Sequence, residues 1–224
     1  MFTFSLSGLE IKASDSGPIE VEENETTARS AVYMVLGSFF APPGDSHFDK
    51  AVNDHWEKEM TEAASLLPFE FDTGHPTIDE ATSKEAYIGE YDRLFSSGDR
   101  LNLLVASQYS SDPENLMAQV KRDYEYFGLG GSESSERPID HLASECDFLQ
   151  YLCFKEAASP SPRLAGSYRR AQRDFLERHL ISWVPDIVAK VTPLNPIKPY
   201  DWALSRLNDF IQADYAYIKA LLGG

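Results

Sequence analysis

The 224-residue sequence has few cysteines, few basic residues and no long apolar run. Its two cysteines, Cys146 and Cys153, lie seven positions apart in one predicted helix. Seven residues rise about 10.5 Å along a helix, which is too far for a disulfide within it. We therefore expect two free thiols, which suit a reducing compartment.

Apolar runs are short. The longest mostly apolar stretch, residues 31–41, contains Gly37 and Ser38, whereas a helix needs about 20 apolar residues to span a bilayer. No basic residue precedes Lys12, and a secretory signal begins with a positively charged region. These absences predict a soluble, cytoplasmic protein without a membrane span.

Basic residues are outnumbered, with 20 Lys and Arg against 36 Asp and Glu and a formal net charge of −16. Nucleic-acid binders usually carry a basic face, so neither nucleic acid nor an anionic membrane surface is an expected partner. Acidic charge keeps a protein soluble, and it also speeds the encounter with a basic partner. Net charge names no partner, and both interpretations stay open.

Hydrophobic residues are plentiful at 42%, and 12% of the chain is aromatic, which is enough for a core. After the first 25 residues, apolar side chains recur at spacings of three and four, as in Phe48, Val52 and Trp56. The three tryptophans, Trp56, Trp183 and Trp202, lie on such stripes and are predicted core residues. Seven or more amphipathic helices joined by loops predict an all-α fold.

Composition also divides the chain. Residues 1–25 are predicted to form a flexible N-terminal tail, and residues 26–224 a single globular multi-helix domain. The Gly/Ser/Glu-rich stretch 128–137 predicts an exposed hinge loop before the last third. The predicted helices cover about residues 26–40, 48–67, 77–95, 113–127, 138–158, 164–185 and 200–221.

The sharpest polar cluster follows this hinge. In a helix that begins near Pro138, His141 and Glu145 stand at positions i and i+4 on one face. Asp140 would lie in the first turn, where a carboxylate meets the positive end of the helix. One interpretation is a recognition site for a basic peptide. The other is a structural helix start in which one His pairs with one Glu, and residue types alone do not separate them.

Other chemistries find less support. Zinc prefers three or four ligands, but neighbours such as Glu145 and Cys146 point about 100° apart on a helix, and HExxH and CxxC are absent. We therefore expect no metal and no cofactor. Residues 128–131, GLGG, follow a helix and precede no Gly-Lys-Ser/Thr, so they indicate a helix stop rather than a phosphate loop. No Gly-x-Ser-x-Gly motif is present to support a serine hydrolase.

Three blocks occur in order: EYDRLF at residues 90–95, YEYFGL at 124–129 followed by PIDHLASECDFL at 138–149, and FLERHLISWVP at 175–185. Together they resemble the TorD/DmsD/NarJ family of redox-enzyme maturation chaperones, over about residues 26–220. The resemblance implies an all-helical protein that is not an enzyme. It implies binding to the catalytic subunit of a molybdopterin oxidoreductase of the dimethyl-sulfoxide-reductase type until its cofactor is inserted. Many members bind the twin-arginine leader of that subunit.

The resemblance also implies which residues bind this partner, here named the client. Client recognition falls on Pro138, Asp140, His141 and Glu145, and the other block, with Tyr91, Arg93 and Phe95, is expected to shape a groove. In this hypothesis a basic, apolar client segment lies in the groove, and the carboxylates of Asp140 and Glu145 bind its arginines.

Several points stay open. After Phe95 the chain reads SSGDRLNLLVASQYSSD, where the family often has Gly-Pro and an aromatic-Pro-Ser segment. Binding to the mature client subunit is therefore as open as binding to its leader. The protein is expected to be a monomer or a dimer. Two alternatives are a permanent helical accessory subunit of the redox complex and a small enzyme or nucleotide binder that uses Asp140, His141 and Glu145.

Overall fold

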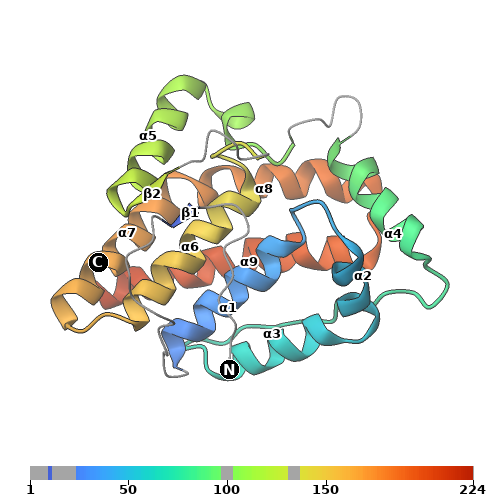
Figure 1. Ribbon diagram of the computed structural model, residues 1–224, viewed down its shortest axis with the longest axis horizontal. Helices are drawn as coiled ribbons and strands as arrows, with labels where there is room; N and C mark the ends of the chain where they lie inside the picture. Colours follow the sequence, from blue (N-terminus) through green and yellow to red (C-terminus); the bar gives the residue numbers. More distant parts are fainter. Residues whose placement is uncertain (1–9, 12–23, 97–102, 131–136, 224) are drawn as a thin grey trace.

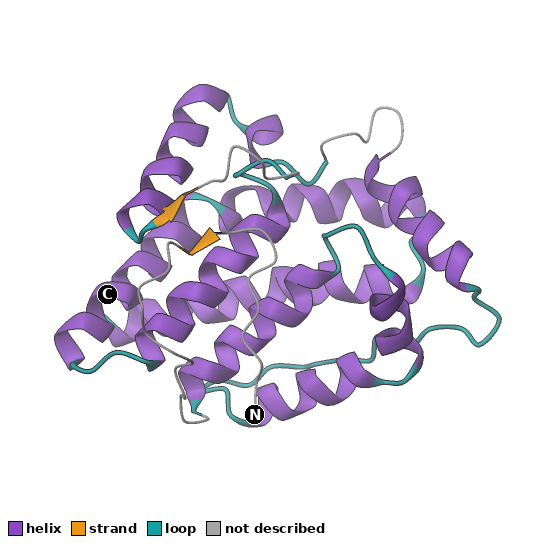
Figure 2. Ribbon diagram, viewed as in Figure 1, coloured by secondary structure: helices purple, strands orange, loops and turns teal. Residues whose placement is uncertain are grey.

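The computed structural model describes residues 10–11, 24–96, 103–130 and 137–223. Its elements are β1 (Glu10–Ile11), α1 (Glu25–Ser38), α2 (Asp45–Val52), α3 (His55–Ser65), α4 (Lys84–Tyr91), the π-helical η1 (Asp92–Ser96), the 3-10 turn η3 (Ala106–Tyr109), α5 (Pro113–Tyr126), β2 (Leu129–Gly130), α6 (Leu142–Ala157), α7 (Pro162–Arg178), α8 (Leu180–Val191), the 3-10 turn η4 (Thr192–Leu194) and α9 (Lys198–Leu221). The predicted all-α class is confirmed (Figure 2). The predicted tail, 1–25, and hinge, 128–137, lie largely outside the described residues.

Local capping explains several helix starts. The Asn24 side chain accepts hydrogen bonds from the backbone amides of Thr26 and Thr27, which satisfies free donors at the start of α1. Asp112 caps α5 and Ser161 caps α7, and each is followed by a proline in the first turn. These starts were readable from the sequence because cap and proline stand next to the helix.

Three predicted helices differ from the structure. The predicted helix 48–67 is two helices, because Asp54 adopts a left-handed backbone (φ 54°) that separates α2 from α3. The predicted helix 77–95 begins only at Lys84, where Ser83 supplies the cap. The predicted helix 164–185 breaks at His179 instead of Pro185, which lies inside α8.

Helix α1 runs through the middle of the molecule and packs against α3, α6 and α9 (Figure 1). The closest approach is at Gly37, where a Cβ atom would lie 2.7 Å from the Cβ of Cys146 on α6. Glycine is therefore required there by the helix spacing. The three tryptophans are buried, as predicted, and both cysteines are free and buried.

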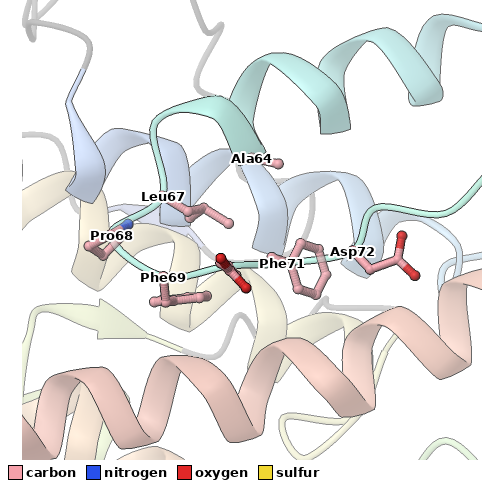
Figure 3. Close-up of a pocket in the computed structure, with 7 residues that line it drawn as sticks. Ala64, Leu67, Pro68, Phe69, Phe71 and Asp72 are labelled. Carbon is pink, nitrogen blue, oxygen red and sulfur yellow. The ribbon is translucent and has the colours of Figure 1, made fainter.

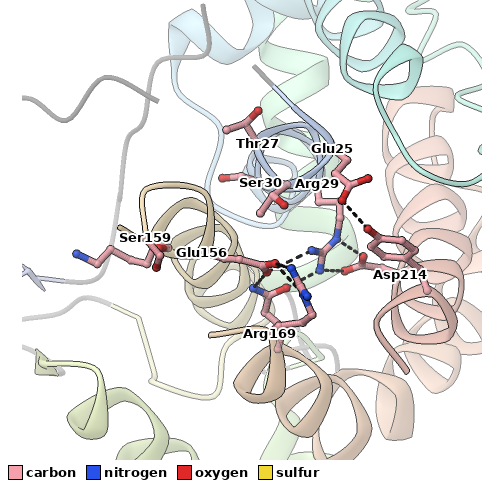
Figure 4. Close-up of polar contacts among 12 residues, drawn as sticks. Glu25, Thr27, Arg29, Ser30, Glu156, Ser159, Arg169 and Asp214 are labelled. Carbon is pink, nitrogen blue, oxygen red and sulfur yellow. Dashed lines mark hydrogen bonds and ion pairs between the residues drawn. The ribbon is translucent and has the colours of Figure 1, made fainter. Parts of the chain in front are cut away.

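A buried polar network ties four of these helices together (Figure 4). It consists of Arg29 and Tyr33 of α1, Glu156 of α6, Arg169 and Gln172 of α7 and Asp214 of α9. Arg29 forms an ion pair with Asp214, and its other end lies 3.7 Å from Glu156. Arg169, whose side chain is 28% exposed, pairs with the buried Glu156. Two arginines and two carboxylates thus balance their charge inside the fold.

Besides the helices, the described residues include two short strands, β1 and β2. Gly128 (φ 76°) ends α5, as predicted, and β2 then pairs antiparallel with β1, with Ile11 opposite Leu129. Two-residue strands are too short to show an alternating pattern, so β2 was not predicted. Within the described part of the chain, no helix has the length and apolar character needed to cross a bilayer.

Candidate functional site

The residues predicted to bind the client lie in two places. Pro138, Asp140, His141 and Glu145 surround the start of α6, and Tyr91, Arg93 and Phe95 lie at the end of α4 and in η1. Helix α6 begins at Leu142, so the prediction that it begins near Pro138 is wrong. His141 is the N-cap residue, and its Nδ1 accepts a hydrogen bond from the Ala143 amide at 3.2 Å.

The later helix start has a cause distant in sequence. Residues 103–109, here named the strap, cross the α6 start, and Val105 forms an antiparallel bridge with His141. The Ala106 amide donates to the Asp140 carbonyl at 2.9 Å, and the Leu142 amide donates to the Leu104 carbonyl at 2.8 Å. This pairing holds His141 extended, and Asp140 lies in the turn closed by the hydrogen bond from the His141 amide to the Pro138 carbonyl at 3.2 Å. Asp140 thus precedes the helix, and the prediction that it lies in the first helical turn is wrong.

The polar side chains at this position are covered. Asp140 is 1% exposed, His141 9% and Glu145 0%, whereas Pro138 is exposed. The expected pairing of His141 with Glu145 does not form, because Glu145 Oε2 instead accepts a hydrogen bond from Trp183 Nε1 at 3.2 Å. The two carboxyl groups thus lie beneath the surface in this structure, not on the rim of an open groove. Their role in client binding stays a prediction.

Only one oxygen of each of these carboxyl groups accepts a hydrogen bond among the described residues. Asp140 Oδ2 accepts a hydrogen bond from the Ser107 amide of the strap at 2.8 Å. Asp140 Oδ1 and Glu145 Oε1 are buried and have no hydrogen-bond partner among the residues that the structure describes. Most buried polar atoms in folded proteins are hydrogen-bonded, so two such oxygens within six residues are unusual. The segment therefore holds acceptors that the fold itself does not use.

Burial sets the protonation of this segment. It raises the pKa of Glu145 well above its usual range, and the nearby Asp140 adds to this shift. Burial, assisted by the charge of Arg137, lowers the pKa of His141 to about 4. His141 is therefore neutral at pH 7, which fits its role as an acceptor at the helix start. The raised pKa of Glu145 means that its charged form is disfavoured in this position.

Flanking contacts fix the segment. Arg137 pairs with Asp147 at 3.1 Å, and the Tyr124 hydroxyl donates to the Ile139 carbonyl at 3.0 Å. Burial raises the pKa of Asp147 to about 6 although Arg137 acts in the opposite direction. Asp147 and Ser107 were not among the residues predicted to form the site. Ser107 acts through its backbone amide, which every residue except proline has, so no sequence signal marks it.

The second group is structural in its contacts. Tyr91 and Phe95 are buried against the ring of Tyr200, and the Tyr91 hydroxyl donates to the Phe40 carbonyl at 3.0 Å. Arg93 binds Glu90 through two hydrogen bonds of 2.6 and 2.7 Å and also reaches the carbonyl of Leu194. These side chains hold η1 against α9 and the turn before it, and their part in client binding stays a prediction.

A separate shallow hollow of about 600 Å³ lies beside the end of α3 (Figure 3). Its lining residues are Ala64, Leu67, Pro68, Phe69, Glu70, Phe71 and Asp72. Phe69 and Phe71 also pack against Phe210 of α9, so the hollow is the outer edge of the core. It contains none of the residues predicted to bind a client. Across the described residues, no group of three or more His, Cys, Asp and Glu is placed to hold a metal ion.

Known proteins match this chain over about half of its length or more. A family model described as nitrate reductase delta subunit matches residues 49–189. A chlorate reductase assembly chaperone protein of Ideonella dechloratans is 33% identical over 51% of this chain and 62% of its own length. A selenate reductase assembly chaperone protein of Thauera selenatis is 34% identical over 49% and 59%. A chaperone protein TorD of Vibrio cholerae is 30% identical over 54% and 57%. This chain thus spans about three fifths of the length of these relatives.

Proposed function

Since this chain belongs to the nitrate reductase delta subunit family, we propose that it is an assembly chaperone for the catalytic subunit of a molybdopterin oxidoreductase. The resemblance to the TorD/DmsD/NarJ family is confirmed by the family match and by the relatives. The observation that carries the proposal is this match, because it includes the whole α6 start, and relatives over about half of the chain are named as assembly chaperones. In this role the protein is not a catalyst, and it acts in the cytoplasm before the client is complete.

We further propose that the client is recognised through its twin-arginine leader. The acidic chain, with net charge −16, favours encounter with a basic segment. Asp140 and Glu145 each have one carboxyl oxygen without a donor among the described residues, and a guanidinium group offers five donors. The apolar part of the leader would supply most of the affinity. A chaperone must release its client, so we expect a Kd near 1 µM, about −8 kcal/mol.

The enzyme alternative has less support. A general acid or base must come within hydrogen-bond distance of its substrate. Asp140, His141 and Glu145 are buried, and each has a structural contact to α8, the strap or the α6 backbone. The permanent-subunit alternative predicts tight, stoichiometric, salt-resistant association with the mature complex, which co-purification measures.

The role is tested by deleting the gene and measuring the activity and molybdenum content of the oxidoreductase whose catalytic subunit is encoded beside it. We expect both to fall, and the wild-type gene to restore them. Unchanged activity and metal content in the deletion strain would contradict the chaperone role.

The recognition mode is tested by calorimetric titration with a 20-residue peptide that has two adjacent arginines before an apolar run. A matched peptide with two lysines is the control, because lysine keeps the charge but not the planar, two-pronged donor geometry. We expect the arginine peptide to bind about tenfold more tightly. Equal affinities for the two peptides would contradict recognition of arginine. Binding of the mature client subunit but of neither peptide would favour recognition of the mature subunit instead of its leader.

A further inference from the structure

We infer that the strap, residues 103–109, is an exchangeable cover for Asp140 and for the Trp183 indole that binds Glu145, and that the basic segment of the client takes its place. The inference rests on the proposed function, because the client is what displaces the strap. It adds a step that the proposed function does not contain: the free protein is closed, and binding competes with an internal contact.

The strap already occupies the acceptor site in part. The Ser107 amide donates to Asp140 Oδ2 at 2.8 Å, as a client donor would. Two backbone hydrogen bonds, from Ala106 to Asp140 and from Leu142 to Leu104, align the strap with the segment before α6. In the free protein, the hydrogen-bond donor to the Asp140 carboxylate is thus a neutral backbone amide. A guanidinium group makes stronger, charge-assisted hydrogen bonds to the same oxygen.

The strap leaves part of the site unsatisfied. Asp140 Oδ1 and Glu145 Oε1 are both buried and lack a partner among the described residues. The indole of Trp183 uses the other Glu145 oxygen. The strap thus uses one of the four carboxyl oxygens and Trp183 a second, which is a poor match to the site. A ligand with several N–H donors in one plane would use the remaining acceptors, and the arginine side chain is such a group.

Aromatic contacts show what displacement would uncover. The ring of Tyr109, the last strap residue, lies 5.3 Å from the ring of Trp183, and its hydroxyl donates to the Leu103 carbonyl. The ammonium group of Lys190 lies 4.0 Å from the centre of the Tyr109 ring. Lifting the strap would therefore bare the Trp183 indole next to the two carboxyl groups. An apolar wall beside paired acceptors suits a segment in which arginines precede apolar residues.

A disulfide that holds the strap closed tests this. The two flanking hydrogen bonds make Val105 and His141 a non-hydrogen-bonded antiparallel pair, whose Cα atoms are typically about 4.5 Å apart. That spacing lies within the range of disulfides. The oxidised Val105→Cys, His141→Cys protein is expected to bind the arginine peptide at least about tenfold more weakly than the same protein reduced, because the open form is depleted.

The matched control is Val105→Ser, His141→Ser under the same oxidant, where oxidation should change nothing. This control keeps Cys146 and Cys153 and also lacks the His141 side chain, so it shows any effect of oxidising the two native cysteines or of losing His141. Equal affinity of the oxidised and reduced double-cysteine proteins overturns the cover. Absence of binding to every form, wild type included, overturns the proposed recognition of arginine and the cover together.

A second pair of variants weakens the strap and does not depend on the disulfide. Ser107→Pro removes the amide that binds Asp140, and a proline is tolerated in the first turn of η3. Ser107→Ala removes the hydroxyl and keeps the amide. We expect the proline variant to bind the arginine peptide about three- to tenfold more tightly than wild type, and the alanine variant to match it. Misfolding does not produce such a gain, and unchanged or weaker binding by a folded proline variant overturns the cover.

Discussion

Replacing Glu145 by Gln separates the effect of this residue on folding stability from its effect on client binding. The side chain is completely buried, and burial raises its pKa well above the ordinary 4.5. In the unfolded chain the group ionises near pH 4.5, so the folded state binds the proton more tightly. Stability therefore falls as the pH rises above 4.5, by about 1.4 kcal/mol for each pH unit over which the folded group stays protonated.

The magnitude follows from the same numbers. At pH 7 the cost reaches at most about 3.5 kcal/mol, since 7 lies 2.5 units above 4.5. Gln has the same shape and no charge. Its oxygen accepts from Trp183 Nε1 as Glu145 Oε2 does. We expect Glu145→Gln to be more stable than wild type at pH 7 and equal to it at pH 4.5.

Chemical denaturation between pH 4.5 and 8 measures this difference, and Glu62→Gln, the same change at an exposed position of α3, is the control that should follow wild type. The same Glu145 variant should bind the arginine peptide about tenfold or more weakly. A guanidinium group lowers the pKa of a carboxyl group that it binds and so favours the charged form of Glu145, which Gln lacks, and the resulting charge-assisted hydrogen bond contributes roughly 1.5–3 kcal/mol. Gain of stability with loss of binding would mark Glu145 as a residue kept for function. Parallel pH profiles of variant and wild type would refute the reasoning.

Three further predictions concern the scaffold. Gly37→Ala should lower the free energy of unfolding by about 1–2 kcal/mol in denaturant titrations, because its Cβ would meet that of Cys146. Gly89→Ala, with nothing within 4 Å, should instead raise it by up to about 1 kcal/mol, and a gain at both positions would contradict the packing argument. Arg29→Met should cost about 3–5 kcal/mol by the same titration, because it leaves buried carboxylates without their partner, and a smaller loss than 1 kcal/mol would argue against the network. Burial lowers the pKa of His47 from 6.5 to about 4, so its contribution to stability is complete above pH 6.5 and is lost as the pH falls toward 4. His47→Gln should therefore reduce the fall in the free energy of unfolding between pH 6.5 and 4, measured by denaturant titration. The same fall in variant and wild type would refute this.

Much of the fold was predictable because its causes are local. Helices α5 and α7 begin at an Asp-Pro and a Ser-Pro pair that stand next to them in the sequence. Breaks at Asp54 and His179 were not predicted. Apolar spacing continues across both positions, so the periodic pattern does not show that the backbone turns there.

The candidate site was found in the sequence, but its geometry was not. The cluster of Asp140, His141 and Glu145 was recognisable from residue types and from the family resemblance. Its helix start was misplaced because the strap pairs with it from about 35 residues away through backbone groups. Backbone amides and carbonyls belong to every residue except for the missing amide of proline, so such pairing leaves no mark in the sequence.

The sequence by itself determined the helical class, the free thiols and the burial of Trp56, Trp183 and Trp202, because spacing along a helix decides which side chains share an apolar face. Only the tertiary structure decided that Arg29 meets Asp214, 185 residues away, that Asp140 binds the strap and that Glu145 binds Trp183. Those positions depend on how separate segments pack in space, and packing brings together residues that no local pattern connects.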